Sequence, residues 1–119
     1  MSESDAYDLF REGQKRLRAG MTAQATVPLE KAKKLEPAKA SIREALGIAY
    51  FRLSRWRDAE REFRTILEEL SPTDHYAHYA LGRALEHLGK TTEANGHYKL
   101  ASSMKPTSET YSSRILDLE

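Results

Sequence analysis

Small and apolar residues recur along the chain at a spacing of 34 or 35 residues. Three glycines stand at this spacing; each is followed 12 residues later by an alanine, and four residues after that by a bulky residue. These nine positions are Gly13, Gly47 and Gly82, then Ala25, Ala59 and Ala94, then Leu29, Phe63 and Tyr98. A proline follows each set, at Pro37, Pro72 and Pro106. A fixed period of this length indicates a repeat protein whose units stack on their neighbours.

Each repeat predicts two antiparallel helices joined by a short turn. Glycine and alanine leave room for close contact between the two helices. Proline ends the second helix because it lacks an amide donor and disfavours helical backbone in the residue before it. Gly20, Ser54 and Gly89 fall in the predicted turns. The predicted helices span about 6–19, 22–36, 40–53, 56–70, 74–88 and 91–104.

A final amphipathic segment follows the third repeat. Over 108–118, Tyr111, Ile115 and Leu118 lie at i, i+4 and i+7, and the other face is polar. An array of stacked units needs such an end, with one apolar stripe for the previous unit and a polar outer surface. We therefore predict an N-terminal tail at 1–5 and a single domain at 6–119. Its repeats cover about 6–39, 40–74 and 75–108, and a capping helix covers about 108–118.

The middle repeat resembles the tetratricopeptide repeat. The resemblance rests on the segment 45–50 (Ala-Leu-Gly-Ile-Ala-Tyr), on 56–59 (Trp-Arg-Asp-Ala), on Phe63 and on the late Pro72. It extends over three repeats, from residue 6 to residue 106. The resemblance implies an all-α, right-handed superhelical solenoid of three helix-turn-helix hairpins with a C-terminal capping helix. It also implies a non-catalytic adaptor or scaffold that binds another protein.

Three features depart from that family pattern. The first repeat has Glu12 where the family usually has leucine, and Arg16 where it has tyrosine. Pro28 falls inside the predicted second helix, where it removes one amide hydrogen bond and clashes with the preceding turn. We therefore expect a kink, or a late start of this helix, near 25–28. The middle repeat has one extra residue before Pro72, which predicts a wide turn or bulge.

Composition narrows the functional class. The chain has 119 residues, enough for one domain. Its formal charge of +1 gives no strong field for nucleic acid or anionic lipid, so we expect neither partner. The absence of cysteine excludes disulfides, thiolate metal sites and a cysteine nucleophile. With no long apolar run and a charged N-terminal segment, the expected location is the cytoplasm.

No catalytic motif is present. The six glycines are scattered, so there is no phosphate-binding or dinucleotide-binding loop, and no serine lies in a Gly-x-Ser-x-Gly turn. His75 and His78 are one helical turn apart, but no further ligand follows at a metal-binding spacing. We therefore expect no enzyme activity, no cofactor and no metal.

The resemblance also implies which residues face a concave groove. In family members that bind peptides, these come from the first helix of each repeat. At the matching positions stand Tyr7, Phe10, Gln14, Arg18, Ile48, Phe51, Arg52, Tyr76, Tyr79, Arg83 and His87, with Leu17, Ser41, Glu44 and Glu86 beside them. Aromatic and aliphatic residues that alternate with arginines are typical of interface hot spots. The predicted partner is an apolar peptide or helix with acidic residues. In the alternative interpretation, Phe10, Phe51, Tyr76 and Tyr79 only pack between repeats.

The residues also bear on chaperone tails, self-assembly and RNA as possible partners. One branch of the family clamps the C-terminal EEVD carboxylate of chaperones with lysine, asparagine and arginine. The matching positions here are Phe10, Gln14, Ala45, Tyr76 and Ala80, so we expect no binding of such a tail. The alternative function is a self-assembling, homo-oligomeric structural protein. A weak basic bias in the first third makes RNA binding a minor option.

Overall fold

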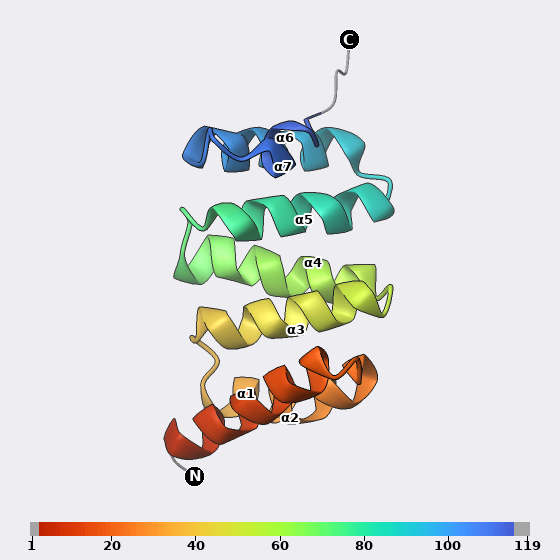
Figure 1. The fold of residues 1–119 in the computed structure, drawn as a ribbon. Helices are drawn as coiled ribbons and strands as arrows, with labels where there is room; N and C mark the ends of the chain where they lie inside the picture. Colours follow the sequence, from red (N-terminus) through yellow and green to blue (C-terminus); the bar gives the residue numbers. More distant parts are fainter. Residues whose placement is uncertain (1–2, 116–119) are drawn as a thin grey trace.

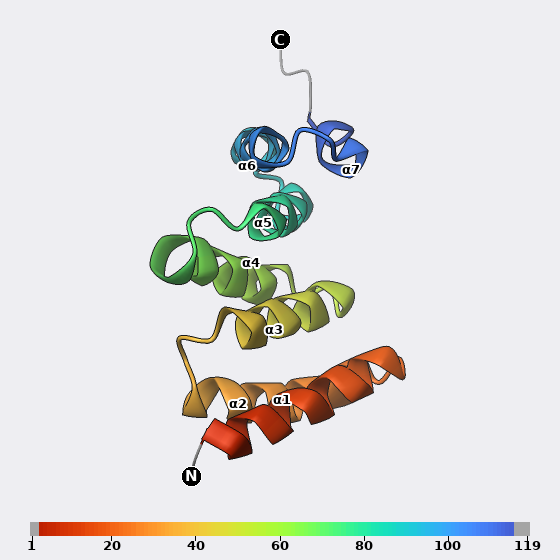
Figure 2. The ribbon, with the colours of Figure 1, turned by 60° about the vertical axis from the view of Figure 1, so that its left-hand side comes forward.

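The computed structural model describes residues 3–115 and is helical throughout, apart from turns. Successive helices form antiparallel pairs that stack along one direction, and the two ends of the chain lie at opposite ends of the stack (Figures 1 and 2). The elements are α1 (Glu3–Arg18), α2 (Thr22–Leu35), α3 (Ala40–Arg52), α4 (Trp56–Thr65), η1 (Ile66–Leu70), α5 (His75–His87), α6 (Thr91–Met104) and α7 (Glu109–Ser112). The prediction of an all-α array of three helix pairs is confirmed.

The recurring glycine and the recurring bulky residue are the two sides of one contact. A Cβ atom placed on Gly47 would lie 2.6 Å from Cζ of Phe63, and one on Gly82 would lie 2.5 Å from Cε1 of Tyr98. At Gly13 the corresponding atom is Cδ2 of Leu29, at 2.4 Å. No side chain fits at these distances without a shift of its neighbour. The first helix of each pair therefore lies directly on the large side chain of the second.

In all three repeats, the turn inside the helix pair contains one residue with a left-handed backbone, at the equivalent position. Gly20 has φ +77° and Gly89 has φ +78°, while Ser54 holds the equivalent position with φ 60°. Such a backbone costs an L-residue other than glycine about 1–2 kcal/mol. The middle repeat therefore carries a small strain that glycine avoids in the other two.

The extra residue of the middle repeat is absorbed as a π-helical turn. After α4 the chain continues as η1, and the amide of Ser71 donates to the carbonyl of Ile66, at 2.7 Å. In the first and third repeats the equivalent bonds run from Glu36 to Ala32 and from Lys105 to Ala101, one residue closer in the sequence. The predicted bulge is therefore a single wide turn, as π-bulges usually are.

The first repeat departs from the prediction at Pro28. Helix α2 begins at Thr22 and continues through Pro28 without interruption, so the late start expected near 25–28 is wrong. Because proline has no amide hydrogen, the carbonyl of Gln24 loses its usual partner one turn earlier. Nη1 of Arg16 donates to this carbonyl, at 3.0 Å, and Nε of Arg16 is held by Glu12 at 3.1 Å. Two residues that depart from the family pattern thus compensate for the third.

The two ends of the domain also differ from the prediction. Helix α1 begins at Glu3, inside the segment predicted as a tail. Helix α7 ends at Ser112 and residues 113–115 are not helical, so over the described residues the capping helix is shorter than predicted. Tyr111 is buried and Ile115 packs on the core from beyond the helix. Leu118 lies outside the described residues.

Across residues 3–115, no helix has both the length and the apolar composition needed to cross a membrane.

We predict that Arg16→Ala lowers the free energy of unfolding by about 1 kcal/mol, because the Gln24 carbonyl loses its donor. In a Pro28→Ala background the same change should cost less, since the alanine amide then supplies that hydrogen bond. The lost contact with Glu12 is common to both backgrounds and cancels in the double-mutant cycle. Urea denaturation followed by circular dichroism measures the four values.

Lys15→Ala is the control for this cycle, because Lys15 is an exposed residue of the same helix. An equal loss from Arg16→Ala in both backgrounds would show that the arginine does not compensate for the proline.

Candidate functional site

The first helices of the three pairs, α1, α3 and α5, line a hollowed face. Two adjoining hollows share Ile48 and Arg52, and together we call them the groove. The hollow between α3 and α5 has a volume of about 170 Å³, and the one between α1 and α3 about 500 Å³. The first is lined by Ile48, Phe51, Arg52, Phe63, Tyr76, Tyr79, Ala80 and Arg83. The second is lined by Phe10, Gln14, Leu17, Arg18, Ser41, Glu44, Ala45, Ile48 and Arg52.

Helix α3 runs through the middle of the groove and sets its character. Glu44, Ile48 and Arg52 lie four residues apart, so each lies one helical turn beyond the previous one on the same face. The groove therefore has a carboxylate near one end of α3, an aliphatic side chain at the centre and a guanidinium at the other end.

Aromatic rings form the part of the groove between α3 and α5. The rings of Tyr76 and Tyr79 lie 6.2 Å apart, and Phe63 meets Tyr76 edge-on at 6.3 Å. Arg83 donates from Nη1 to the Tyr79 hydroxyl at 3.2 Å, and its guanidinium carbon lies 5.1 Å from the centre of the Phe51 ring. The hollow is thus walled by aromatic faces with one arginine held across them.

Phe51 also packs between repeats, as the alternative interpretation expected. Its ring meets Trp56 edge-on at 4.9 Å and His87 at 5.4 Å, and the imidazole of His87 stacks on Trp56 at 3.8 Å with an angle of 6°. This cluster joins α3, α4 and α5. Phe51 therefore does two things: it connects repeats and lines the groove.

The structure brings nine of the eleven predicted groove residues into the two hollows, and Tyr7 and His87 are the exceptions. Tyr7 is 57% exposed and lies with Phe10 beside the α2–α3 connection, in a separate hollow. His87 stacks on Trp56 and lines neither hollow. Phe63 was not predicted because it belongs to a second helix. The available signal was Gly47: it has no side chain, so the buried Phe63 ring can lie against α3, where it borders the hollow between α3 and α5.

The charges in the groove are not paired within it. Over the described residues, no hydrogen bond or ion pair joins Glu44, Arg18 or Arg52 to another group. Burial and then the nearby Asp74 raise the pKa of Glu44 above its ordinary value. Burial and then Glu44 also raise the pKa of the Tyr76 hydroxyl. Glu44 is therefore a half-buried carboxylate in an acidic neighbourhood, whereas Arg18 and Arg52 are exposed cations.

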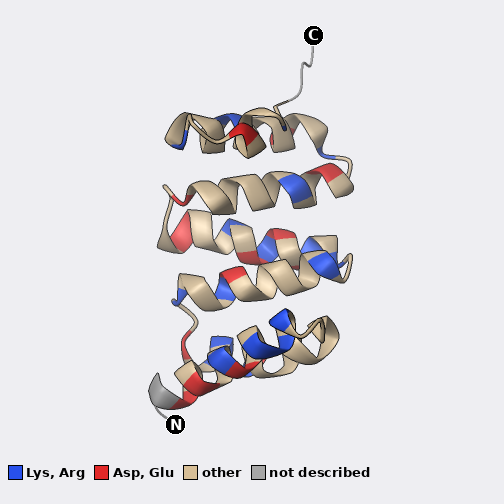
Figure 3. Cartoon of the chain, in the orientation of Figure 1, with Lys and Arg blue, Asp and Glu red and all other residues tan. Residues whose placement is uncertain are grey.

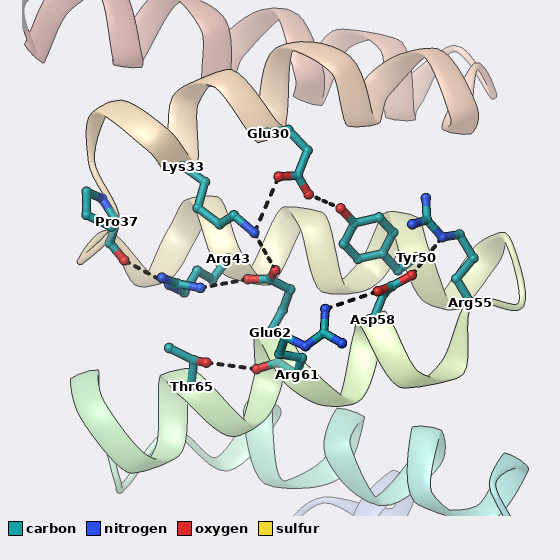
Figure 4. Close-up of polar contacts among 10 residues, drawn as sticks. All are labelled: Glu30, Lys33, Pro37, Arg43, Tyr50, Arg55, Asp58, Arg61, Glu62 and Thr65. Atoms are coloured by element: carbon teal, nitrogen blue, oxygen red, sulfur yellow. Dashed lines mark hydrogen bonds and ion pairs between the residues drawn. The ribbon is translucent and has the colours of Figure 1, made fainter.

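Ion pairs elsewhere join the repeats to one another. Figure 4 shows Glu62, which is 2% exposed, between Lys33 of α2 and Arg43 of α3, at 2.9 and 3.0 Å. Lys33 also reaches Glu30, which accepts a hydrogen bond from the Tyr50 hydroxyl. In Figure 3, charges of both signs are interspersed over the first four helices, while most of α5 is uncharged. The aromatic part of the groove thus lies along a helix with few charges.

His75, His78 and His97 each make a hydrogen bond with another group of the protein. His75 Nδ1 lies 2.7 Å from the Tyr111 hydroxyl, which joins α5 to α7. His78 Nε2 lies 3.0 Å from the Pro72 carbonyl, which can only accept, so this nitrogen carries the proton. The bare Nδ1 of His78 then accepts from the Nδ1–H of His97, at 3.0 Å. Within residues 3–115 no three His, Cys, Asp or Glu side chains are grouped so as to hold a metal ion.

Stacked helical hairpins with a groove along the first helices define a helical-repeat binding fold. The sequence matches the tetratricopeptide repeat over residues 44–109, and the chain belongs to that family. Such domains are generally protein–protein interaction modules and typically non-catalytic.

One curated relative is superkiller complex protein 3 of Mus musculus. It is 30% identical over 96 residues, which cover 81% of this chain and 6% of that protein. The chain thus spans a small part of that relative's length.

Solved structures share the fold. The first TPR domain of Spaghetti (RPAP3), bound to the HSP90 peptide SRMEEVD, matches with a TM-score of 0.90 and 22% identity, over 97% of this chain and 90% of that one. The Arabidopsis OM64 TPR domain matches with a TM-score of 0.87 and 19% identity, over 92% and 89%. The crystal structure of MamA matches with 0.88 and 23%, over 92% and 64%.

The histidine pair predicts how stability depends on pH. Burial, and then the electrostatic influence of the adjacent His78 imidazole, lower the pKa of His97 below its ordinary value. The unfolded chain therefore takes up more protons than the folded chain as the pH falls below the ordinary histidine pKa. We predict that the free energy of unfolding decreases from pH 7 to pH 5, by at most about 1.4 kcal/mol per pH unit for one proton.

Chemical denaturation at a series of pH values measures this slope, and His97→Gln should flatten it. A variant with the same slope as the unmodified chain would assign the pH dependence to other groups.

Proposed function

We propose that this chain is a non-catalytic adaptor that binds a peptide or helix of another protein in its groove. The observation that carries the proposal is the continuity of the two hollows, which bring a cluster of aromatic side chains next to the unpaired Arg18 and Arg52. Aromatic residues and arginines are enriched where partners bury most of their binding energy. Two or three such anchors, less the cost of association, correspond to a dissociation constant of about micromolar order. Its cytoplasmic location stays a prediction from composition.

The partner that we propose differs from the chaperone tail bound by the RPAP3 domain. At the positions where the family's clamp has lysine, asparagine and arginine, this chain has Phe10, Gln14, Ala45, Tyr76 and Ala80. Ala45 and Ala80 line the groove, and neither offers a hydrogen-bond donor from its side chain. The arginines present lie elsewhere on the helices, so they do not reproduce the clamp.

We therefore predict that the peptide SRMEEVD shows no saturable binding at micromolar concentrations. Isothermal titration calorimetry, or fluorescence of the single tryptophan Trp56, measures this directly. Micromolar binding that Phe10→Lys leaves unchanged would mean that the chain recognises the tail by other residues, and the prediction would be wrong.

For the groove itself, we predict that Arg52→Glu weakens partner binding by about tenfold or more, because the arginine shared by both hollows is lost and a like charge meets the partner's acidic residues. Arg52 is exposed, so the fold should not change. Arg57→Glu is the matched control: it makes the same charge change at an exposed position of α4 that lines neither hollow.

Affinity capture with the unmodified chain and both variants, followed by quantitative mass spectrometry, identifies partners that Arg52→Glu alone loses. Calorimetry with the purified partner then gives the affinities. Equal recovery by all three chains would place binding outside the groove. A molar mass that rises with concentration, and that Arg52→Glu lowers, would favour the self-assembling alternative.

A further inference from the structure

Glu44 is a carboxylate in the groove, and a partner with only acidic residues would not complement it. Its side chain is half-buried on α3 and lines the larger hollow. Over residues 3–115 it has no hydrogen-bond donor or cation as a partner, and Asp74 adds a second negative charge nearby. A carboxylate that is partly removed from water is unfavourable unless a donor or a cation compensates it. The groove thus holds one acceptor that a ligand can satisfy.

The cations of the groove lie at its other edge. Arg18 and Arg52 stand at the C-terminal ends of α1 and α3, and both are exposed without an ion pair in the described part of the chain. Arg83 of α5 lies near the same edge, although it already donates to Tyr79. Glu86 is a carboxylate on the basic side of the groove. It lies near the buried Tyr98 hydroxyl, and burial and this carboxylate raise the pKa of that hydroxyl. The free charges therefore separate into an acidic edge and a basic edge, with Ile48 between them.

The distance between the two edges suits a helix. Glu44 and Arg52 are eight residues apart on one face of α3, which corresponds to about 12 Å along its axis. An α-helix with its side chains is about 10–12 Å wide, which matches this separation. A single extended strand is narrower, since neighbouring strands in a sheet lie only about 5 Å apart. A helix that runs along the stack can thus reach both edges at once while its apolar stripe faces Ile48.

From this charge arrangement we propose that the partner segment is an amphipathic helix with basic residues on one side of its apolar stripe and acidic residues on the other. Its basic edge lies on Glu44, its acidic edge on Arg18 and Arg52, and its apolar stripe on Ile48 and the aromatic hollow. This inference rests on the proposed groove-binding function and deepens it. A helix with two acidic edges would instead place a carboxylate against Glu44.

Three designed 18-residue helical peptides test the inference. They share one apolar stripe and differ only at its edges: lysine on one edge and glutamate on the other, glutamate on both, or lysine on both. Each is titrated against the unmodified chain and against Glu44→Gln, Glu44→Lys and Arg52→Glu. Circular dichroism checks that every variant is folded. Glu68→Lys is the matched control, because Glu68 is exposed in η1 and lines neither hollow.

We expect the mixed-edge peptide to bind the unmodified chain about tenfold more tightly than the peptide with two acidic edges. Glu44→Gln should remove most of this preference, and Glu44→Lys should reverse it. Glu68→Lys should keep it. Comparing chain variants with the same peptide cancels differences in peptide helicity.

Three results would overturn the inference, and they separate it from the proposed function. Equal binding of all three peptides, weakened by Arg52→Glu, would leave a binding groove without the charge preference. A preference that Glu44→Lys does not change would remove Glu44 from recognition. Absence of binding by every peptide would exclude a charged amphipathic helix as ligand, while the capture experiment with Arg52→Glu would still decide whether the groove binds a protein.

Discussion

Direct contact between a glycine of one helix and a bulky side chain of its partner determines the geometry of every pair. At Gly47 the ring of Phe63 occupies the space that a Cβ would need, and Gly82 and Tyr98 repeat the arrangement. Because Gly47 has no side chain, the buried ring of Phe63 lies against α3 and borders the hollow between α3 and α5. This is how Phe63, a residue of a second helix, comes to line the groove. The packing constraint that builds the array thus also builds part of its binding surface.

A second pair of equivalent positions, one on each helix of the hairpin, holds different residues in the three repeats. In the middle repeat, Arg43 forms an ion pair with the buried Glu62. In the third, the same positions hold His78 and His97, which share a hydrogen bond. The first repeat has Leu9 and Pro28 there. Because burial and the adjacent His78 lower the pKa of His97, the pair in the third repeat makes stability depend on pH. Repeats of one fold therefore differ in how they respond to the same condition.

Residues with a backbone or packing role could be predicted from the sequence, because their reasons are local and recur with the repeat. Helix ends near Gly20 and Pro37 and the wide turn before Pro72 follow from such reasons. The uninterrupted course of α2 through Pro28 could not be predicted, since it depends on Arg16, which reaches the freed carbonyl from another helix. The amphipathic pattern at the C-terminus also misled, because within the described residues the helix it predicts ends at Ser112.

Groove residues are harder to predict than packing residues, because nothing in the fold requires a particular side chain there. Equivalent positions in the three repeats hold Phe10, Glu44 and Tyr79, so a carboxylate stands in the middle repeat where the other two have an aromatic ring. The position of each could be inferred from the period, but its surroundings could not. That Glu44 lies half-buried near Asp74, without a cation, depends on how α3 and α5 stack. Specificity in such an array therefore resides in the positions whose side chains are not fixed by packing within the repeat.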